Sequence, residues 1–572
     1  MEETKKKIAN CILQTLETNI ELKEIEAKIE VPKDKKNGDF SYPCFHLAKV
    51  LKNSPIQIAN TIKEKIVLDN KFSKVEVVNG FLNFYCNSNE VVKETLEIIL
   101  TKKDSYGSSD EGKGKKIVID YSSPNIAKPF HLGHFRNTVL GSSIYKLYQF
   151  LGYEVIGINH LGDWGRQFGL IIEGYHRFKQ EYDLQKEPVR ALADIYARMN
   201  QLAKEDDSIM DIARDNFKKL EQGDEEVTKL WEFFREVSLK EYNRIYELLG
   251  SKFDSYNGEA FYNDKMQEII DILDKKGVLE DSQGAKVVYV GEDIPPCIVV
   301  KSNGSTIYAT RDLAAILYRA REYDFTKAIY ITATDQILHF KQVFEVAKYL
   351  VDEKYQKNLI HIPYGMVRLK NGKMSTREGT VIYIDELIKE AIDKAKKIIL
   401  EKNNAIEDID GLSRQIGIGA LIFNYLKSSK LKDIIFDLDD TLRFDGETGP
   451  YVQYTYVRTN SILQKANFLD QEINSHTFHF ETLIHDSEVD LVKQLQRFPE
   501  IIKKATEEFE PSILTRYMID IASLFSKFYN ECKVLSCEEI NLKEARLALV
   551  YATSIVIKNG LKLLGIECPD QM

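Results

Sequence analysis

The fold class is decided by the stretch KIVIDYSSPNIAKPFHLGHFRNTVLGSSIYKLYQFLGYEVIGIN, residues 116–159. It begins with an apolar run that has the length of a buried strand, residues 116–121, and it ends with a second such run, residues 154–159. Between them lie a polar loop, residues 122–131, and a helix whose apolar residues recur at helical spacing, namely Phe135, Val139, Leu147 and Phe150. This order predicts a βαβ unit, and therefore a Rossmann-like α/β domain built on a parallel sheet.

The same order of elements predicts where a site lies. Ligands of open parallel sheets bind at the carboxyl ends of the strands. Asp120 stands at the end of the first strand, and His160 follows the second. We therefore expect the functional site at Asp120, in the loop that follows it and at His160.

The flanking segments predict further domains. Residues 1–105 mix helical and strand-like patterns around an Asn79-Gly80 turn, and they indicate an α+β domain. Residues 106–385 form the parallel-sheet domain, with a charged helical insertion at about 170–250. From about residue 384 onward the pattern is helical, which indicates a connector over 386–440 and an all-α bundle over 441–572.

After the insertion, the sheet of the central domain is expected to resume. Strand-like runs stand at residues 286–290, 297–300 and 327–332, and a helix is predicted over 312–323. We expect all three runs to join the parallel sheet.

Composition limits the class of protein. The seven cysteines are scattered and contain no Cys-x-x-Cys, which argues against a disulfide framework and a structural zinc site. No signal peptide and no apolar run of roughly 20 residues is seen, so we expect a cytoplasmic protein that does not enter a membrane. The net charge of −10 argues against non-specific nucleic-acid binding but leaves room for a local basic surface.

The first chemical motif is SPNIAKPFHLGH, residues 123–134, between the strand and the helix. The helix start offers free N–H groups to a phosphate, and Gly133 leaves room for a flat base. His131 and His134 share one helix face and can donate to phosphate oxygens, which stabilises charge that develops in a transition state. The alternatives are a helix-cap pair and a zinc pair, although no third zinc ligand stands nearby.

The second motif is KMSTREG, residues 373–379, which follows an Asn-Gly turn and is expected to form a mobile loop. Lys373 and Arg377 would reach phosphates when such a loop closes. The alternative is an ordinary solvated basic loop. The order of the two motifs favours function.

Together the two motifs resemble the signatures of class I aminoacyl-tRNA synthetases. Four further segments make the chain similar to arginyl-tRNA synthetases over its whole length: GDWGRQFG (162–169), YATRD (308–312), GPYVQY (449–454) and LLGIECP (563–569). The resemblance implies ligation of L-arginine to tRNA(Arg) through an arginyl-adenylate, with release of AMP and pyrophosphate. It implies ATP with Mg²⁺ as a substrate complex, no structural metal, and a monomer.

The resemblance also implies site residues. His131, Gly133, His134, Lys373, Met374 and Ser375 would bind ATP, and His131, His134, Lys128, Lys373 and Arg377 would act in catalysis. The family's usual second signature is Lys-Met-Ser-Lys-Ser, and here Thr376 replaces the second lysine. Lys128 stands where a compensating lysine is found in such enzymes, so the share of Lys128, Lys373 and Arg377 in phosphate stabilisation stays open.

Arginine recognition calls for carboxylates, because a guanidinium is a planar cation with donors in a fixed fork. The resemblance implies Asp120, Asp312, Tyr308 and Glu259 for this end of the substrate. It implies Ser123, Asn125 and Gln336 for the α-ammonium group. The alternatives are an ion pair for Asp120, a helix N-cap for Asp312 and a solvated loop acid for Glu259.

For tRNA, the resemblance implies that residues 441–572 read the anticodon and that the N-terminal domain touches the tRNA elbow. Tyr451, Tyr454, Tyr456 and Arg458 offer aromatic rings and a cation for unpaired bases. The alternative is that the tyrosines belong to the bundle core. Three rival functions also stay open: a synthetase for another amino acid, a small-molecule nucleotidyltransferase and a non-catalytic RNA-binding relative.

Overall fold

The computed structural model describes residues 2–16, 20–32, 34–369, 383–402, 406–468 and 477–572. The chain divides into two compact units. Unit 1 comprises Met1–Gly107, Thr455–Ile501 and Asp520–Asn559, and unit 2 comprises Ser108–Tyr454, Ile502–Ile519 and Gly560–Met572.

The N-terminal part of unit 1 is an α+β layer, as predicted. Its antiparallel sheet has the order β1-β3-β2. Asn79 (φ 49°) and Gly80 (φ 84°) are both left-handed, which is the backbone that a tight hairpin turn between β2 and β3 requires. The elements are α1 (Glu2–Leu13), α2 (Leu22–Glu26), β1 (Phe40–Pro43), α3 (Leu47–Leu51), α4 (Pro55–Lys65), β2 (Phe72–Val78), β3 (Phe81–Cys86) and α5 (Ser88–Lys102).

Unit 2 contains the predicted parallel sheet, with the order β10-β9-β4-β5. The strands are β4 (Lys116–Asp120), β5 (Glu154–Ile158), β9 (Lys327–Ala333) and β10 (Leu359–Tyr364). In the register, Asp120 lies beside Ile158 of β5 and Tyr330 of β9, so the carboxyl ends of the three strands meet at one edge. The predicted βαβ unit is confirmed, with α6 (Leu132–Phe150) as its crossover helix.

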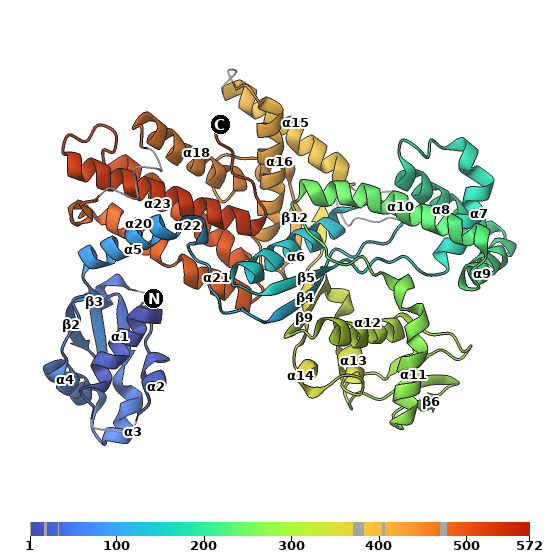
Figure 1. The fold of residues 1–572 in the computed structure, drawn as a ribbon, viewed down its shortest axis with the longest axis horizontal. Helices are drawn as coiled ribbons and strands as arrows, with labels where there is room; N and C mark the ends of the chain where they lie inside the picture. The colour runs from blue at the N-terminus through green and yellow to red at the C-terminus, as the bar shows by residue number, and fades with distance from the viewer. Residues whose placement is uncertain (1, 17–19, 33, 370–382, 403–405, 469–476) are drawn as a thin grey trace. The chain divides into compact units, whose positions relative to one another are not determined.

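Helices cover the sheet (Figure 1). α6 approaches β4 closely, because a Cβ added to Gly141 would lie 2.3 Å from the ring of Tyr121. α12 (Tyr308–Tyr323) and α13 (Ile337–Ala347) share a core with β4 and β9, in which Leu313, Ile316 and Val343 are fully buried. This shared core holds α12 and α13 against the sheet.

Two of the three later strands do not join the parallel sheet, which corrects the prediction. β6 (Glu280–Ser282), β7 (Ala285–Val288) and β8 (Cys297–Val300) form a separate antiparallel sheet. Neighbouring strands in this sheet are joined by short connections without a helix, whereas a parallel pair needs a long crossover. Only the run at 327–332 returns to the main sheet, as β9.

The insertion is helical, as predicted, and consists of α7 (Gln167–Phe178), α8 (Pro188–Glu205), α9 (Ser208–Glu221) and α10 (Glu225–Leu248). Two further helices of unit 2 are α11 (Met266–Lys275) and the short α14 (Glu353–Gln356). Further along, α15 (Ile384–Lys402), α16 (Ile409–Leu426) and α17 (Leu438–Thr441) follow. The prediction of uninterrupted helix from residue 384 is wrong at β12 (Ile434–Phe436), which pairs with β11 (Val367–Leu369).

The described residues of 441–572 contain helices and no strand. They are α18 (Gly449–Lys465), α20 (Asp486–Gln496), α21 (Phe498–Glu507), α22 (Ser512–Glu531) and α23 (Ile540–Leu564). Among the described residues, α23 is the one helix long and apolar enough to cross a membrane by length and composition. However, 83% of its most apolar window is buried inside the protein, as in a core helix.

Candidate active site

The loop after β4 is strained and tightly held. Ser122 (φ 69°), Ser123 (φ 46°) and Ala127 (φ 57°) adopt left-handed backbone, which costs about 1–2 kcal/mol for each non-glycine residue. Side chains of neighbouring helices hold this backbone. Asn137 Oδ1 accepts the Ser122 N–H at 2.9 Å, and Ser238 Oγ accepts the Ala127 N–H at 2.9 Å. Such strain is typical of a functional loop.

His131 and His134 stand at the start of α6, with ring centroids 3.7 Å apart and planes 18° from parallel. Nδ1 of His131 accepts the Gly133 N–H at 3.1 Å, and Nδ1 of His134 accepts the His131 N–H at 3.4 Å. The helix-cap alternative is therefore real. However, capping uses only Nδ1, so each neutral ring keeps its proton on Nε2.

Burial keeps both rings neutral. It lowers the pKa of His131 to about 4, and the positive charge of Lys128 adds to the effect. Burial likewise lowers the pKa of His134 well below its usual value, with His131 and Lys128 adding to the shift. At neutral pH each ring can donate one Nε2–H without adding a cation. Lys128 is half-buried, and its Nζ lies 5.8 Å from the ring centroid of Tyr196.

Asn125 lies against Gly162, the first residue of the GDWGRQFG segment. The two residues form a parallel bridge, and a Cβ on Gly162 would lie 1.9 Å from Oδ1 of Asn125. Tyr242 of α10 donates its hydroxyl to the Asn125 carbonyl at 2.7 Å. The Asn125 side chain can adopt this position only because residue 162 is a glycine and has no Cβ.

Asp120 belongs to a closed ring of polar contacts. Its Oδ2 accepts from Nη2 of Arg319 at 2.8 Å, and its Oδ1 accepts from Ser123 Oγ at 2.8 Å. Ser123 Oγ also accepts the His160 N–H at 3.2 Å, and Arg319 Nη2 donates to His160 Nδ1 at 3.4 Å. The alternative of an ion pair for Asp120 therefore holds, and Ser123 and Asp120 are brought together.

Asp312 lies inside α12 and not at its N-cap. The helix begins at Tyr308, one turn earlier than predicted, and Ile307 is the N-cap residue. The N-cap alternative for Asp312 is therefore wrong. Oδ2 of Asp312 accepts from His339 Nε2 at 2.6 Å, and its Oδ1 lies 4.0 Å from His160 Nε2.

Glu259 begins the short 3-10 helix Glu259–Lys265, and 25% of its side chain is exposed. Burial raises the pKa of Glu259 to about 7, against the effect of Arg311, whose Nη1 lies 3.7 Å away. The charge of Asp312 also raises this pKa, so the two carboxylates are neighbours. The alternative of a solvated loop acid is therefore wrong.

Tyr308 and Gln336, which were also predicted to bind arginine, lie at or next to the starts of α12 and α13. Tyr308 is 57% exposed, with its ring centroid 5.2 Å from that of His339. Gln336 is half-buried, ends the 3-10 helix Thr334–Gln336 that follows β9, and is the N-cap residue of α13. Lys373, Met374, Ser375 and Arg377 lie outside the described residues.

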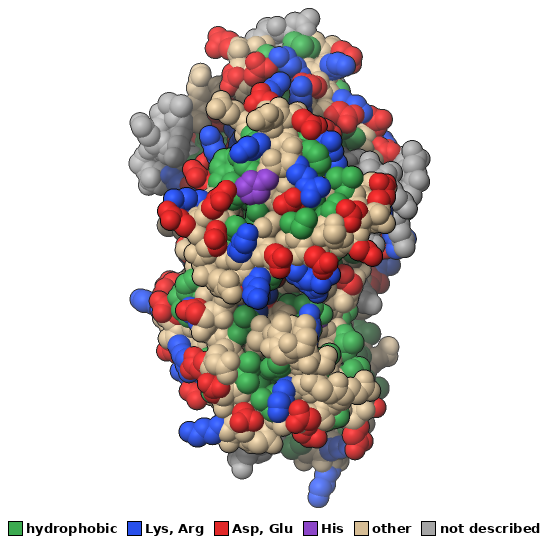
Figure 2. Space-filling model, turned by 90° about the vertical axis from the view of Figure 1, so that its right-hand side faces the viewer, with side chains coloured by type: hydrophobic (Ala, Val, Ile, Leu, Met, Phe, Trp, Pro, Cys, Tyr) green, Lys and Arg blue, Asp and Glu red, His purple; other side chains and the backbone are tan. Residues whose placement is uncertain are grey.

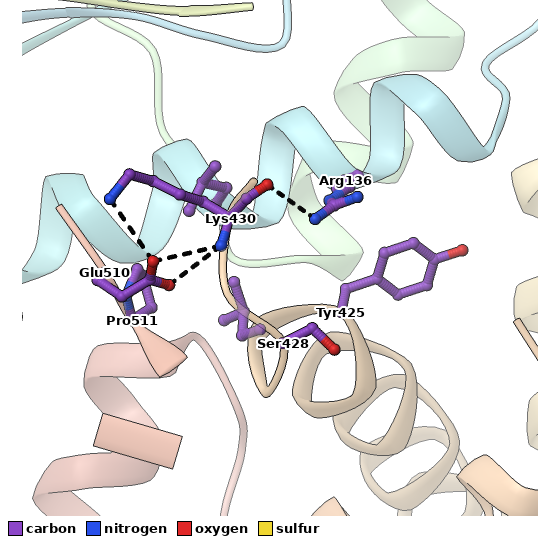
Figure 3. A pocket seen from close by; sticks show the side chains of 8 residues that line it. Arg136, Tyr425, Ser428, Lys430, Glu510 and Pro511 are labelled. Atoms are coloured by element: carbon purple, nitrogen blue, oxygen red, sulfur yellow. Dashed lines mark hydrogen bonds and ion pairs between the residues drawn. The ribbon is translucent and has the colours of Figure 1, made fainter. Parts of the chain in front are cut away.

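Arg136 is a residue that the sequence reasoning missed. It stands in the second turn of α6 and is only 2% exposed. Its guanidinium donates to the carbonyls of Gly365 (2.5 Å), Met366 (3.2 Å), Lys430 (3.0 Å) and Lys432 (2.8 Å). Figure 3 shows the contact to Lys430, which is held in turn by Glu510. Arg136 thus anchors the histidine-bearing helix to the segment that leads into β11.

Arg319 and His339 were missed as well. Arg319 stands seven residues after Asp312, and hence on the same face of α12, among apolar residues. An arginine among the apolar residues of a helix face is a signal that could have indicated a buried carboxylate partner, although it does not say which one. His339 follows Gln336 by three residues, but nothing in its spacing singles it out.

The predicted tRNA residues differ in exposure. Tyr454 is 44% exposed and Tyr451 is half-buried, whereas Tyr456 is buried, as the core alternative predicts. The Arg458 guanidinium lies 4.3 Å from the ring centroid of Tyr529. On the face of the molecule shown in Figure 2, basic and acidic side chains are interspersed, which fits the net charge of −10. The role of these residues stays a prediction.

Three protein families match the chain. The family described as tRNA synthetases class I (R), catalytic domain, matches residues 95–438. The DALR anticodon binding domain matches residues 452–572, and the arginyl tRNA synthetase N terminal domain matches residues 2–86.

Curated relatives match over nearly the whole chain. An arginine–tRNA ligase of Clostridium botulinum (strain Alaska E43 / Type E3) is 46% identical over 569 residues, covering 99% of this chain and 100% of the relative. One of Clostridium perfringens (strain 13 / Type A) is 47% identical over 555 residues, covering 97% of each.

Solved structures agree in fold. The arginyl-tRNA synthetase of Plasmodium falciparum superposes with a TM-score of 0.82 at 26% identity, over 100% of this chain and 99% of that one. That of Thermus thermophilus gives the same TM-score and coverage at 23% identity, which shows the fold alone. With a class I catalytic sheet, an α+β N-terminal domain and a helical C-terminal domain, the chain belongs to the arginyl-tRNA synthetases, within class I of the aminoacyl-tRNA synthetases.

Proposed function

We propose that this chain activates L-arginine with ATP and transfers it to tRNA(Arg). The observation that carries this proposal is the shared edge of the sheet. The carboxyl ends of β4, β5 and β9 lead to a pair of neutral histidines, to Ser123 and to Asp312 with its neighbour Glu259. Side chains suited to donate to phosphate and carboxylates suited to a guanidinium are thus gathered at one edge of the sheet in unit 2.

In the first step, the substrate carboxylate attacks the α-phosphate of ATP, and pyrophosphate leaves. Mg²⁺ would accompany ATP as part of the substrate and neutralise phosphate charge. The Nε2–H groups of His131 and His134 would donate to phosphate oxygens as negative charge builds on them. Because both rings stay neutral, this stabilisation needs no protonation event at physiological pH. Lys128, Lys373 and Arg377 would add positive charge.

At the other end of the substrate, Asp312 and Glu259 would hold the guanidinium, with the Tyr308 hydroxyl beside them. Ser123, Asn125 and Gln336 would hold the α-ammonium group. In the second step, the terminal ribose hydroxyl of tRNA attacks the adenylate carbonyl, and AMP leaves. Tyr451, Tyr454 and Arg458 would contact the tRNA. We further propose a cytoplasmic monomer, and light scattering of the purified chain tests the oligomeric state.

A charging assay tests the proposed function. The purified chain is incubated with ATP, total tRNA and each labelled amino acid in turn, and acid-precipitable label is counted. Label from arginine alone is expected. Charging with another amino acid would identify a different synthetase, and no charging, with adenylyl transfer to a small molecule instead, would identify a nucleotidyltransferase. In the same assay, Tyr454→Ala and Arg458→Ala are expected to raise the KM for tRNA and to leave the KM for arginine unchanged.

A further inference from the structure

We infer that His339 is a positioning residue for arginine recognition: it holds one oxygen of Asp312 so that the other is presented to the substrate guanidinium. This inference rests on the proposed function, because it assumes that Asp312 binds the substrate. His339 lies outside the sequence motifs of the chain and acts on Asp312 through its side-chain contacts.

Asp312 lies between the imidazoles of His339 and His160, and the two lie at different distances from its carboxylate oxygens. His339 Nε2 donates to Oδ2 at 2.6 Å, a short bond to a charged acceptor. On the other side, His160 Nδ1 accepts from Arg319, so the neutral His160 ring carries its proton on Nε2, 4.0 Å from Oδ1. At that distance His160 makes no hydrogen bond. Oδ2 is therefore engaged, while Oδ1 is held only by electrostatic attraction.

His339 is itself fixed in place. Its side chain is 13% exposed, and its ring centroid lies 5.2 Å from that of Tyr308 and 5.3 Å from that of Phe340. Its helix, α13, is anchored by the fully buried Val343 and Val346. Because α12 and α13 pack on the same core, the bond from His339 defines the orientation of the Asp312 carboxylate relative to the sheet edge.

A fixed carboxylate matters for a guanidinium more than for a simple cation. Guanidinium donors lie in one plane, so a carboxylate that is free to rotate binds them less well. Glu259 is a neighbouring acid of Asp312, and Arg311 lies 3.7 Å from it; Asp120 and Asp163 also face His160. Asp120 is paired with Arg319 and Asp163 with Arg235. With Oδ2 of Asp312 taken by His339, its free Oδ1 and Glu259 remain as acceptors for substrate.

The alternative is a purely structural role, in which the hydrogen bond between His339 and Asp312 only stabilises the packing of α12 against α13. A double-mutant cycle separates the two roles. The variants are His339→Leu, which removes the donor, His339→Gln, whose amide can donate in place of Nε2, Asp312→Asn, and Asp312→Asn combined with His339→Leu. His361→Leu is a matched control. The ring centroid of His361 also lies 4.6 Å from that of Phe340, but its Nε2 forms a hydrogen bond with the Thr332 hydroxyl and not with Asp312.

Steady-state arginylation gives the KM values for arginine and ATP, and thermal melting gives the fold stability of each variant. We expect His339→Leu to raise the KM for arginine by about 10-fold or more, with the KM for ATP unchanged, because a bond to a charged group is lost. His339→Gln should recover most of this loss, and His361→Leu should leave the KM for arginine at the native value. In the Asp312→Asn background, His339→Leu should have a much smaller effect on the KM for arginine, because the neutral amide no longer binds the guanidinium as a carboxylate does.

The outcomes distinguish the inference from the proposed function. If His339→Leu lowers the melting temperature but leaves the KM for arginine unchanged, the bond is only structural and the inference is overturned. An equal rise for His361→Leu overturns it too, because the effect then comes from packing on Phe340. If Asp312→Asn itself leaves the KM for arginine unchanged, the proposed role of Asp312 fails, and the inference fails with it.

Discussion

Arg319 and Asp120 form a buried ion pair at the carboxyl end of β4: Nη2 and Oδ2 are 2.8 Å apart, and the two side chains are 1% and 14% exposed. Since Ser123 Oγ occupies the other carboxylate oxygen, both oxygens of Asp120 are engaged within the chain. A substrate guanidinium would have to displace Arg319. We therefore expect guanidinium binding to depend more on Asp312 and Glu259 than on Asp120.

The pair should be essential for stability, because removal of one partner leaves a buried charge uncompensated. Arg319→Met is expected to lower the free energy of unfolding by about 3–5 kcal/mol in urea titrations. The double variant Arg319→Met, Asp120→Asn should recover most of that loss. A loss below about 1 kcal/mol for Arg319→Met would contradict a buried, dry ion pair.

Arginine binding should depend on pH through Glu259, whose pKa burial raises to about 7. A guanidinium favours the ionised carboxylate, so the KM for arginine should fall as pH rises from about 6 to 8 and then level off. Glu259→Gln should raise the KM and flatten this dependence. An unaltered pH profile in the variant would show that another group is responsible.

The same residue should affect stability with a defined sign. The folded-state pKa of Glu259 lies above its unfolded value, so its contribution to stability is full below about pH 4.5 and is lost as pH rises through about 7. Glu259→Gln is therefore expected to raise the free energy of unfolding, measured by urea titration, by about 1–3 kcal/mol at pH 8. At pH 4.5 the variant and the native chain should differ little. The opposite sign at pH 8 would mean that the ion pair with Arg311 outweighs burial.

Gly162→Ala should disturb the α-ammonium end of the site, because the added Cβ would meet Asn125 Oδ1 at 1.9 Å. We expect the KM for arginine to rise, with a loss of about 1–3 kcal/mol in stability from overpacking. Combined with Asn125→Ala, the glycine substitution should add little to the KM. Full additivity of the two KM effects would show that Gly162 acts through something other than Asn125.

Arg136→Lys should lower kcat more than it changes either substrate KM. An ammonium has three donors and no planar fork, so it cannot serve the four carbonyls that Arg136 reaches. A shift of α6 would displace His131 and His134, and a misplacement of 1 Å costs up to about 100-fold in rate. Glu510→Gln, which weakens the contact to Lys430 but leaves the carbonyl bonds, is the milder control. A native kcat for Arg136→Lys would refute the anchoring role.

His131→Ala should lose rate and keep substrate affinity. If its Nε2–H stabilises charge mainly in the transition state, kcat should drop by about 100- to 1,000-fold, with little change in the KM for ATP. The measurement is pyrophosphate exchange in the presence of tRNA. A change confined to KM would place His131 in ground-state binding only.

Local patterns in the sequence predicted the central βαβ unit, the helical insertion and the hairpin at Asn79-Gly80 because these depend on periodicity and turn chemistry over short distances. The positions of Asp120, the His131 loop and His160 at strand ends also followed from the order of elements. By contrast, β7 and β8 were assigned to the wrong sheet, because a strand's partner depends on the length and course of its connections. The helix that carries Asp312 began one turn before the predicted start, at Tyr308.

The sequence by itself determined the family, the order of the elements and the set of chemical groups at the carboxyl ends of the strands, since each follows from residues close together along the chain. Only the tertiary structure decided which of those groups are already engaged. Arg319 pairs with Asp120 across about 200 residues of chain, and Arg136 binds carbonyls of residues 365 to 432. Such contacts arise from packing of distant segments. The desolvation that raises the pKa of Glu259 also comes from the packing of distant segments. Neither the partners in these contacts nor this pKa shift can therefore be read from a local pattern.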